Sequence, residues 1–339
     1  MSKVKLVSHL SSWGIASCLI FLSVPAFARG DYQQCILDAI ASAKDDARVA
    51  DIRAQCAARF SVPPLTTSDN RESPVFEQGV MRERLQMEID AENTPFMFTP
   101  HLPNYFGYST FEPNQAPFSP LTEINDSVEN QEAVFQLSFK APIWRDMFGS
   151  GLNTYFAYTA KSWWQVANSE FSNPFRETNY MPEVFVRDVR GKDVLGLDVV
   201  GWSLGVAHES NGREQALSRS WNRVIGRAGI QLHDDVSLFG QLWYRIPDDE
   251  DDDNPNEYRF YGYGDVRAVW TPNKNTFTAM VRPGTEELSY ELTWSYPVSR
   301  VFRVYASYYN GFGESLLDYD FDGRRFMLGI ALNDFIARQ

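Results

Sequence analysis

The residues best suited to chemistry lie in one short stretch, 203–229, with the sequence SLGVAHESNGREQALSRSWNRVIGRAG. His208 and Ser210 are two residues apart, and Asn222 follows twelve residues after the serine. On a β-strand, residues two apart point to the same side with Cα atoms about 6.6 Å apart, so the imidazole can reach the hydroxyl. A serine needs a base to become a nucleophile, and the base needs a third group to orient it. The stretch therefore predicts a Ser-His-Asn hydrolase site on a β-hairpin.

Strand parity puts these polar groups on the apolar side of their strands. The residues predicted to share the face of His208 are Val200, Trp202, Leu204 and Val206. Asn222 falls on the apolar face of the next strand, with Ser218 and Ser220. A hairpin that turns about Gln215 sets Asn222 opposite His208, because facing residue numbers then sum to about 430. Polar groups at a lipid surface are costly unless they are paired or functional. The alternative is a set of polar residues near a barrel rim that contact lipid headgroups.

A second serine motif in this stretch does not have the context that its chemistry needs. The sequence GWSLG at 201–205 matches the G-x-S-x-G pattern of lipases. That pattern works only as a tight turn from a strand into a helix. Here it lies inside a strand pattern with Ser203 on the inward face, so we exclude Ser203 as the nucleophile.

The hairpin belongs to a long series of strand patterns. Apolar and polar residues alternate with period two from about residue 96 onwards. The predicted strands, about twelve in number, span 96–108, 132–141, 153–165, 182–190, 196–208, 218–231, 236–246, 258–270, 275–282, 287–296, 301–309 and 325–336. Connections after odd-numbered strands are mostly long and the others mostly short, as in bacterial outer-membrane barrels. We predict a twelve-stranded antiparallel transmembrane β-barrel with a short N-terminal helical and linker segment.

The strand faces and the lack of long apolar runs indicate how this chain would cross a membrane. Beyond the N-terminus no apolar run approaches the ~18 residues of a transmembrane helix, so any spanning must be done by strands. In a barrel the apolar face is outside, and the face that carries Arg219, Arg223 and Arg227 lines the lumen. A soluble antiparallel sheet shows the same alternation. A soluble periplasmic esterase on a β-sandwich therefore stays an alternative.

The N-terminal part has the features of an exported protein. Residues 1–28 combine Lys3 and Lys5, an apolar stretch and an Ala-Phe-Ala cleavage site, which predicts a secretory signal. Residues 29–94 are expected to form a periplasmic helical segment and linker, and 95–339 the barrel.

Two cysteines follow the predicted signal, Cys35 and Cys56, and an exported chain favours a disulfide between them. One straight helix would hold them roughly 30 Å apart, which is too far to bond. The bridge therefore requires a helical hairpin that bends near residues 45–46.

Charge limits the range of partners. The formal net charge is −13 at pH 7, and a chain this acidic is a poor nucleic-acid binder, so we expect no nucleic-acid partner. The acidic run at 248–253, DDEDDD, falls in a predicted loop. Most such runs are solvated and we assign it no site, with weak cation binding as the alternative.

Four motifs resemble the outer membrane phospholipase A family. They are HESNGR at 208–213, SRSWNR at 218–223, KSWWQ at 161–165 and PFRETNY at 174–180. The resemblance covers the barrel, roughly residues 95–336. It implies a calcium-dependent hydrolase (phospholipase A1/A2) that cleaves acyl esters of phospholipids and lysophospholipids at the outer leaflet of the bacterial outer membrane.

The resemblance also implies roles for particular residues. By matching position, Ser210 would be the nucleophile, His208 the general base and Asn222 its orienting partner. Calcium would be held by the carbonyl of Arg213, the hydroxyl of Ser218 and the carbonyl of Ser172 from the other subunit of a homodimer. Ala160 lies on the outward face near the family's subunit seam, where members can carry Gln, so we expect a weaker or differently tuned dimer.

A rival reading from another class is a porin-like or structural barrel without enzymatic activity. It requires a lumen open enough for solutes. Inward-facing Arg, Lys, Trp and Tyr side chains predict a filled interior, which favours the hydrolase.

Overall fold

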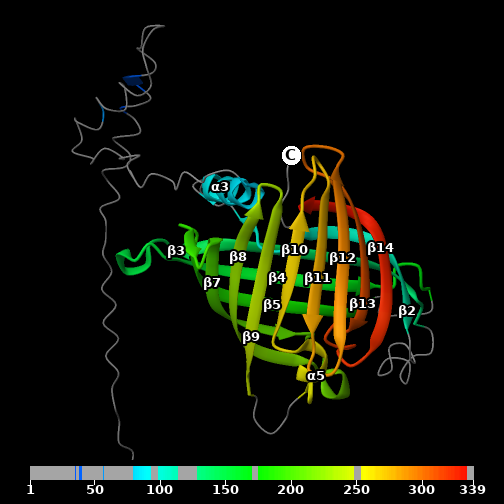
Figure 1. The fold of residues 1–339 in the computed structure, drawn as a ribbon. Helices are drawn as coiled ribbons and strands as arrows, with labels where there is room; N and C mark the ends of the chain where they lie inside the picture. The colour runs from blue at the N-terminus through cyan, green and yellow to red at the C-terminus, as the bar shows by residue number, and fades with distance from the viewer. Residues whose placement is uncertain are drawn as a thin grey trace, which may run out of the picture. The chain divides into compact units, whose positions relative to one another are not determined.

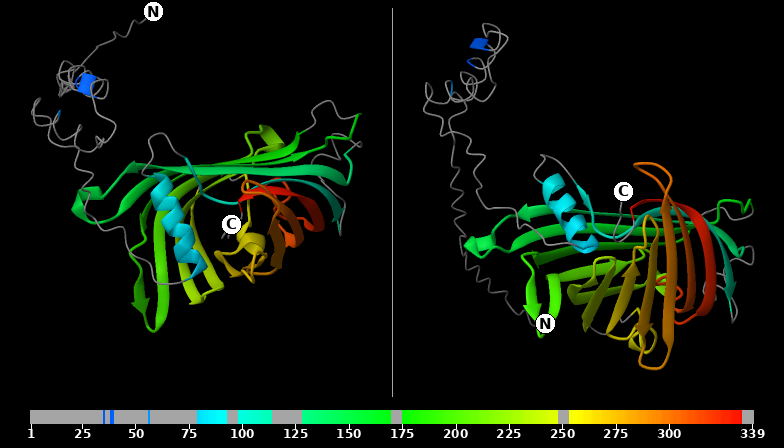
Figure 2. Two further views of the ribbon diagram at one scale, coloured as in Figure 1. Left: turned by 90° about the horizontal axis from the view of Figure 1, so that it is seen from above. Right: turned by 45° about the horizontal axis from the view of Figure 1, so that its top comes forward.

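The strands form a closed antiparallel barrel (Figures 1 and 2). The computed structural model describes residues 35, 38, 39, 56, 79–92, 98–113, 128–169, 175–247 and 253–333. Among these, each long strand pairs with its neighbours in order, and β3 pairs with both β2 and β4, which closes the ring at twelve strands. Two short strands, β1 and β6, pair only with β3 and β7. The predicted barrel is confirmed, and the β-sandwich alternative is excluded.

The barrel strands have the following bounds: β2 Asn104–Pro113, β3 Gln131–Trp144, β4 Asn153–Trp164, β5 Phe175–Asp188, β7 Leu197–Ser210, β8 Ser220–His233, β9 Val236–Ile246, β10 Gly264–Trp270, β11 Thr276–Pro283, β12 Leu288–Pro297, β13 Arg303–Phe312 and β14 Asp322–Asn333. The short strands are β1 Thr99–Pro100 and β6 Lys192–Val194, and the helical elements are α3 Val80–Glu92, α5 Tyr258–Tyr261, η1 Met147–Gly149 and η2 Gln215–Leu217.

Most predicted strands lie within a few residues of the observed ones, and three differ. The segment predicted as one strand at 96–108 is interrupted by a bend after Pro100. The segment 258–270 begins as the short helix α5 and becomes a strand only at Gly264. β5 begins at Phe175, seven residues before its predicted start at 182.

The two faces of the strands have opposite chemistry, as the alternation predicts. In β14, Phe326 and Leu328 are about half exposed on the outside, at 55% and 54%. Arg325 and Asn333 of the same strand are buried inside. Outward apolar and inward polar side chains suit a strand wall between lipid and lumen.

The lumen is filled with paired charges and aromatic rings. Arg176 is fully buried and donates to Glu132 at 2.6 Å and to Asp318 at 2.5 Å. Trp163 is also fully buried, with Arg176 5.8 Å from its ring centre. Buried ions of this kind persist only when they are paired. The predicted filled interior is therefore confirmed, and it counts against a porin.

Helix α3 lies at one end of the strands, and α5 lies at the other (Figure 1). Val80 and Met81 at the start of α3 donate backbone hydrogen bonds to Asp234 and Gln231, at the turn between β8 and β9. This helix falls within residues 29–94, which the sequence predicts to be a helical segment and linker, and it lies in the same compact unit as the barrel. The chain divides into two compact units, Met1–Glu72 and Ser73–Gln339.

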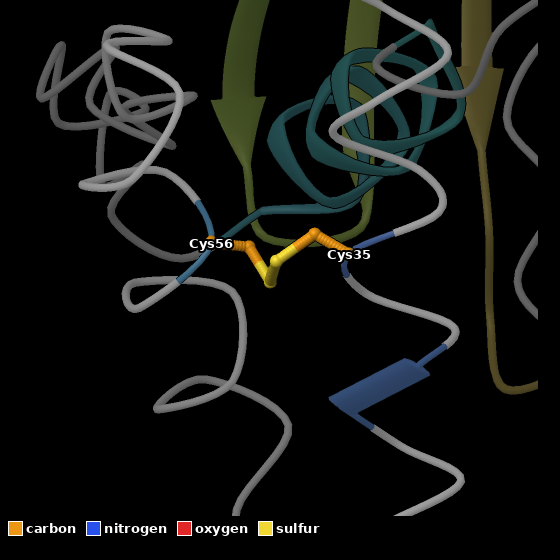
Figure 3. The surroundings of a disulfide bond; sticks show 2 residues. All are labelled: Cys35 and Cys56. Atoms are coloured by element: carbon orange, nitrogen blue, oxygen red, sulfur yellow. A yellow bond between two sulfur atoms is a disulfide. The ribbon is translucent and has the colours of Figure 1, made fainter.

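In the first unit, Cys35 and Cys56 form a disulfide with a Cα–Cα distance of 5.9 Å (Figure 3). Both cysteines have helical backbone, in keeping with a bridge between helical segments. The predicted bend at 45–46, the signal at 1–28 and the C-terminal residues 334–339 lie outside the described residues. Within the described residues, no helix combines the length and apolarity that crossing a membrane requires.

Candidate active site

Strands β7 and β8 form the hairpin that carries the predicted site. Their register pairs His208 with Asn222 and Ser210 with Ser220, so facing residue numbers sum to 430 as predicted. The turn contains η2, and Gln215 at its start has a φ of 55°. Because both partners of each pair point to the same side of the sheet, His208, Ser210 and Asn222 share one face.

That face is the outer surface of the barrel. His208 and its strand neighbours Leu204 and Val206 are exposed, whereas Ala207 between them is buried in the lumen. The Nδ1 atom of His208 lies 2.9 Å from Oδ1 of Asn222. A carboxamide oxygen can only accept, so this contact places the proton on Nδ1 and leaves Nε2 free to accept one.

One residue predicted for this face lies on the other side. Val200 is fully buried and packs with Val80 and Met81 of α3. The register between β7 and β8 shifts between Val199 and Gly201. A β-bulge adds one residue to a strand and reverses the alternation before it. The prediction that Val200 shares the face of His208 is therefore wrong.

Beneath the outward site, the inward residues of the same strands are held together. Glu209 accepts a hydrogen bond from Nε1 of Trp221 at 3.0 Å and forms an ion pair with Arg223. The guanidinium of Arg223 lies 3.7 Å from the ring centre of Trp221. These cross-strand contacts fix the register that aligns His208 with Asn222.

The loop between the two strands carries two of the residues predicted to bind calcium, Arg213 and Ser218. The hydroxyl of Ser218 donates to Oδ2 of Asp253 at 2.6 Å. The sequence assigned no site to the acidic run that ends at Asp253, because no spacing rule shows which loops pack together. The third predicted ligand, Ser172, lies outside the described residues. Among the described residues, no three His, Cys, Asp or Glu side chains gather as a metal site.

Ser203 of the excluded G-x-S-x-G motif faces the inside of the barrel, as predicted. Ser203 belongs to β7 and lines a partly open pocket of about 190 Å³ beside α3. It pairs with Arg227 across β8, on the inward face. Ser203 is thus separated by the barrel wall from the His208–Asn222 pair.

A closed barrel whose outer face is apolar fits a protein of the bacterial outer membrane, and the outward His–Asn pair beside a serine fits a hydrolase. The profile of the phospholipase A1 family matches residues 81–332. The chain is 32% identical to phospholipase A1 of Escherichia coli K12, over 79% of this chain and 91% of that protein. It is 33% identical to phospholipase A1 of Klebsiella pneumoniae, over 78% and 90% of the two chains. The chain belongs to the phospholipase A1 family.

Solved structures agree with this assignment. The Salmonella typhi outer membrane phospholipase, a dimer with bound calcium, superposes with a TM-score of 0.69 at 31% identity, over 77% of this chain and all of that one. An Escherichia coli outer membrane phospholipase A with an active-site asparagine replaced by alanine gives a TM-score of 0.68 at 31% identity, over 73% of this chain and 97% of that one.

Proposed function

We propose that this protein hydrolyses acyl ester bonds of phospholipids and lysophospholipids in the outer leaflet of the outer membrane, with Ser210 as nucleophile, His208 as general base and Asn222 as its orienting partner. The observation that carries the proposal is the 2.9 Å contact between His208 and Asn222, with Ser210 next to them on the same outward face. The family assignment supports the substrate class.

Each residue has a defined part in the reaction. Oγ of Ser210 attacks the ester carbonyl carbon while Nε2 of His208 takes the hydroxyl proton. Collapse of the tetrahedral intermediate breaks the ester bond, and His208 returns the proton to the departing alcohol. A water molecule, deprotonated by His208, then hydrolyses the acyl-enzyme and releases the fatty acid. Throughout, Oδ1 of Asn222 accepts the bond from Nδ1 and stabilises the imidazole in the orientation that both steps need.

The outward position explains how a membrane lipid reaches the nucleophile. Exposed apolar side chains precede His208 on β7, at Leu204 and Val206. An acyl chain can lie against them without leaving the hydrocarbon, which avoids the cost of transferring it through water. The filled lumen offers no comparable route.

Calcium is the cofactor that the donor chemistry favours. The hydroxyl of Ser218 and the carboxylate of Asp253 lie 2.6 Å apart, and hard oxygen ligands of this kind suit calcium. We propose that the carbonyl of Arg213 and the hydroxyl of Ser218 hold the ion, together with the carbonyl of Ser172 from the partner subunit. Bound there, the cation would supply positive charge close to the developing oxyanion. A ligand from each subunit makes the homodimer the active form.

The test is fatty acid release from phospholipid in detergent, with and without calcium. We expect Ser210→Ala to lower the rate by at least about a thousandfold, because the nucleophile and its base act as a unit. Ser203→Ala is the matched control, since it removes the serine of the rejected motif and should leave the rate unchanged. Full activity in folded Ser210→Ala protein would overturn the proposal.

A further inference from the structure

The side chain of Asn211, the residue after the proposed nucleophile, ties together the loop at 211–219. Its amide group is buried, with the residue 5% exposed. Oδ1 accepts hydrogen bonds from the backbone N–H of Arg213 at 3.2 Å and of Arg219 at 3.0 Å. Nδ2 donates to the carbonyl of Leu217 at 2.8 Å. One amide thus satisfies three backbone groups on two sides of the loop.

These three bonds fall on and around the two loop positions proposed to hold calcium. The bond to the N–H of Arg213 fixes the residue whose carbonyl would be a ligand. The bonds to Leu217 and Arg219 fix the residues on either side of Ser218. The backbone N–H of Asn211 also donates to the carbonyl of Arg219 at 3.0 Å, which anchors this set to the end of the hairpin.

The Asn211 amide is itself held from β5. Glu177 is fully buried, and its Oε2 lies 3.4 Å from Nδ2 of Asn211 and 3.4 Å from Nε of Arg213. The guanidinium of Arg213 also donates to the backbone carbonyls of Phe175 and Arg176. The loop is therefore fastened to the strand that follows the segment containing Ser172.

We propose that Asn211 is a positioning residue that sets the spacing of Arg213 and Ser218, and with it the affinity for calcium; this inference rests on the proposed function. A loop held in its binding conformation before the ion arrives does not have to be ordered by the ion. Without the amide, the backbone positions at both ligands lose their fixed separation, and calcium must order them on binding. Groups that orient metal ligands typically contribute 10–100-fold to affinity.

The test is calorimetric titration of calcium into the full-length protein in detergent. We expect Asn211→Ala to raise the calcium Kd by roughly tenfold or more. Asn211→Gln keeps the amide but moves it by one methylene, so it should also weaken binding, and it tests the idea if the alanine variant does not fold. At limiting calcium, both Asn211 variants should hydrolyse lipid more slowly than wild type. At saturating calcium, their rates should rise toward the wild-type rate.

Asn104→Ala is the matched control. Asn104 is a buried asparagine at the opposite end of the barrel, and its amide bonds the backbone N–H and carbonyl of Ser138. Its loss should lower stability and leave the calcium Kd unchanged. A Kd within twofold of wild type in folded Asn211 variants, or equal shifts in the Asn211 and Asn104 variants, would overturn the inference alone. Wild-type protein that binds no calcium would overturn it together with the proposed calcium site, while loss of activity in Ser210→Ala would still support the hydrolase.

Discussion

In the proposed mechanism, the carboxamide of Asn222 takes the place of the carboxylate found in most serine hydrolases. It sits on the outer surface beside His208, where a charge next to hydrocarbon would be costly. A neutral acceptor orients the ring without that cost, but it stabilises the imidazolium less.

Substitution of Asn222 tests this account at the scale of one residue. We expect Asn222→Ala to lower kcat by roughly tenfold or more, with the 10²–10⁴-fold that a positioned base contributes as the upper bound, because the ring can then turn away from Ser210. Asn222→Asp keeps an acceptor oxygen at the same place and should retain more activity than the alanine variant. Steady-state kinetics on a soluble short-chain ester measure both. Equal rates for wild type and Asn222→Ala would contradict the assigned role.

Local periodicity was enough to predict the His208–Asn222 pair. Strand parity and the pairing of residues across a hairpin depend only on residues close in the sequence. The same reasoning fails at Val200, where a bulge reverses the alternation. It also misses Asp253, whose contact with Ser218 depends on how two loops far apart in the sequence pack. The calcium roles came only from the resemblance, since a backbone carbonyl leaves no mark in a sequence.

At the scale of elements, the carboxylate of Glu88 joins α3 to two barrel strands, in addition to the backbone hydrogen bonds and apolar contacts at the start of the helix. Glu88 accepts from Lys140 of β3 at 2.9 Å and from Arg187 of β5 at 3.0 Å. Within the helix it accepts from Arg84 at 3.0 Å. Burial by itself would raise the pKa of Glu88, but these three cations hold it well below its ordinary value of 4.5.

The lowered pKa gives α3 a defined pH dependence. A carboxyl group with a depressed folded-state pKa contributes stability above its unfolded pKa, and that stability is lost as the pH falls toward the folded value. We therefore expect the docking of α3 to be independent of pH near neutrality and to weaken progressively below about pH 4.5. Glu88→Gln should weaken docking at neutral pH by roughly 2 kcal/mol. Amide hydrogen exchange of residues 80–92 measures both effects.

Asp90→Asn provides the control for this helix. Asp90 is exposed and accepts a surface bond from Gln86, so its substitution should leave exchange nearly unchanged. Equal exchange in Glu88→Gln and wild type would contradict the anchoring role.

The elements were predictable to the extent that their pattern is local. β9 lies at its predicted bounds, 236–246, because a short turn leaves its alternation undisturbed. The helix α5 was predicted as strand, since Tyr258–Tyr261 is aromatic and favours strands in isolation. Its conformation instead follows from tertiary contacts, such as the bond from Tyr261 to the carbonyl of Ser315. The early start of β5 likewise depends on pairing with β4.

At the scale of the whole molecule, the two sides of the barrel wall differ in role: the lumen is filled with side chains, and the proposed active site faces outward. Ion pairs such as Arg176 with Glu132 stabilise the interior, and the outer surface is left for lipid and, in the proposed homodimer, for a second subunit. Association in the membrane then depends on outward residues, among which Ala160 of β4 lies between Leu137 of β3 and Tyr180 of β5.

Substitution of Ala160 tests whether this part of the wall forms the dimer. In Ala160→Gln, an amide at the seam can form hydrogen bonds across the interface, and such bonds within a bilayer contribute about 0.6 kcal/mol on average and up to about 1.7. We therefore expect dimerisation to strengthen by roughly three- to twentyfold, measured by energy transfer between labelled subunits in detergent with calcium. Ala279→Gln is the matched control, because Ala279 is an exposed alanine of β11, six strands away around the twelve-stranded ring. Equal strengthening by both substitutions would show that the seam lies elsewhere.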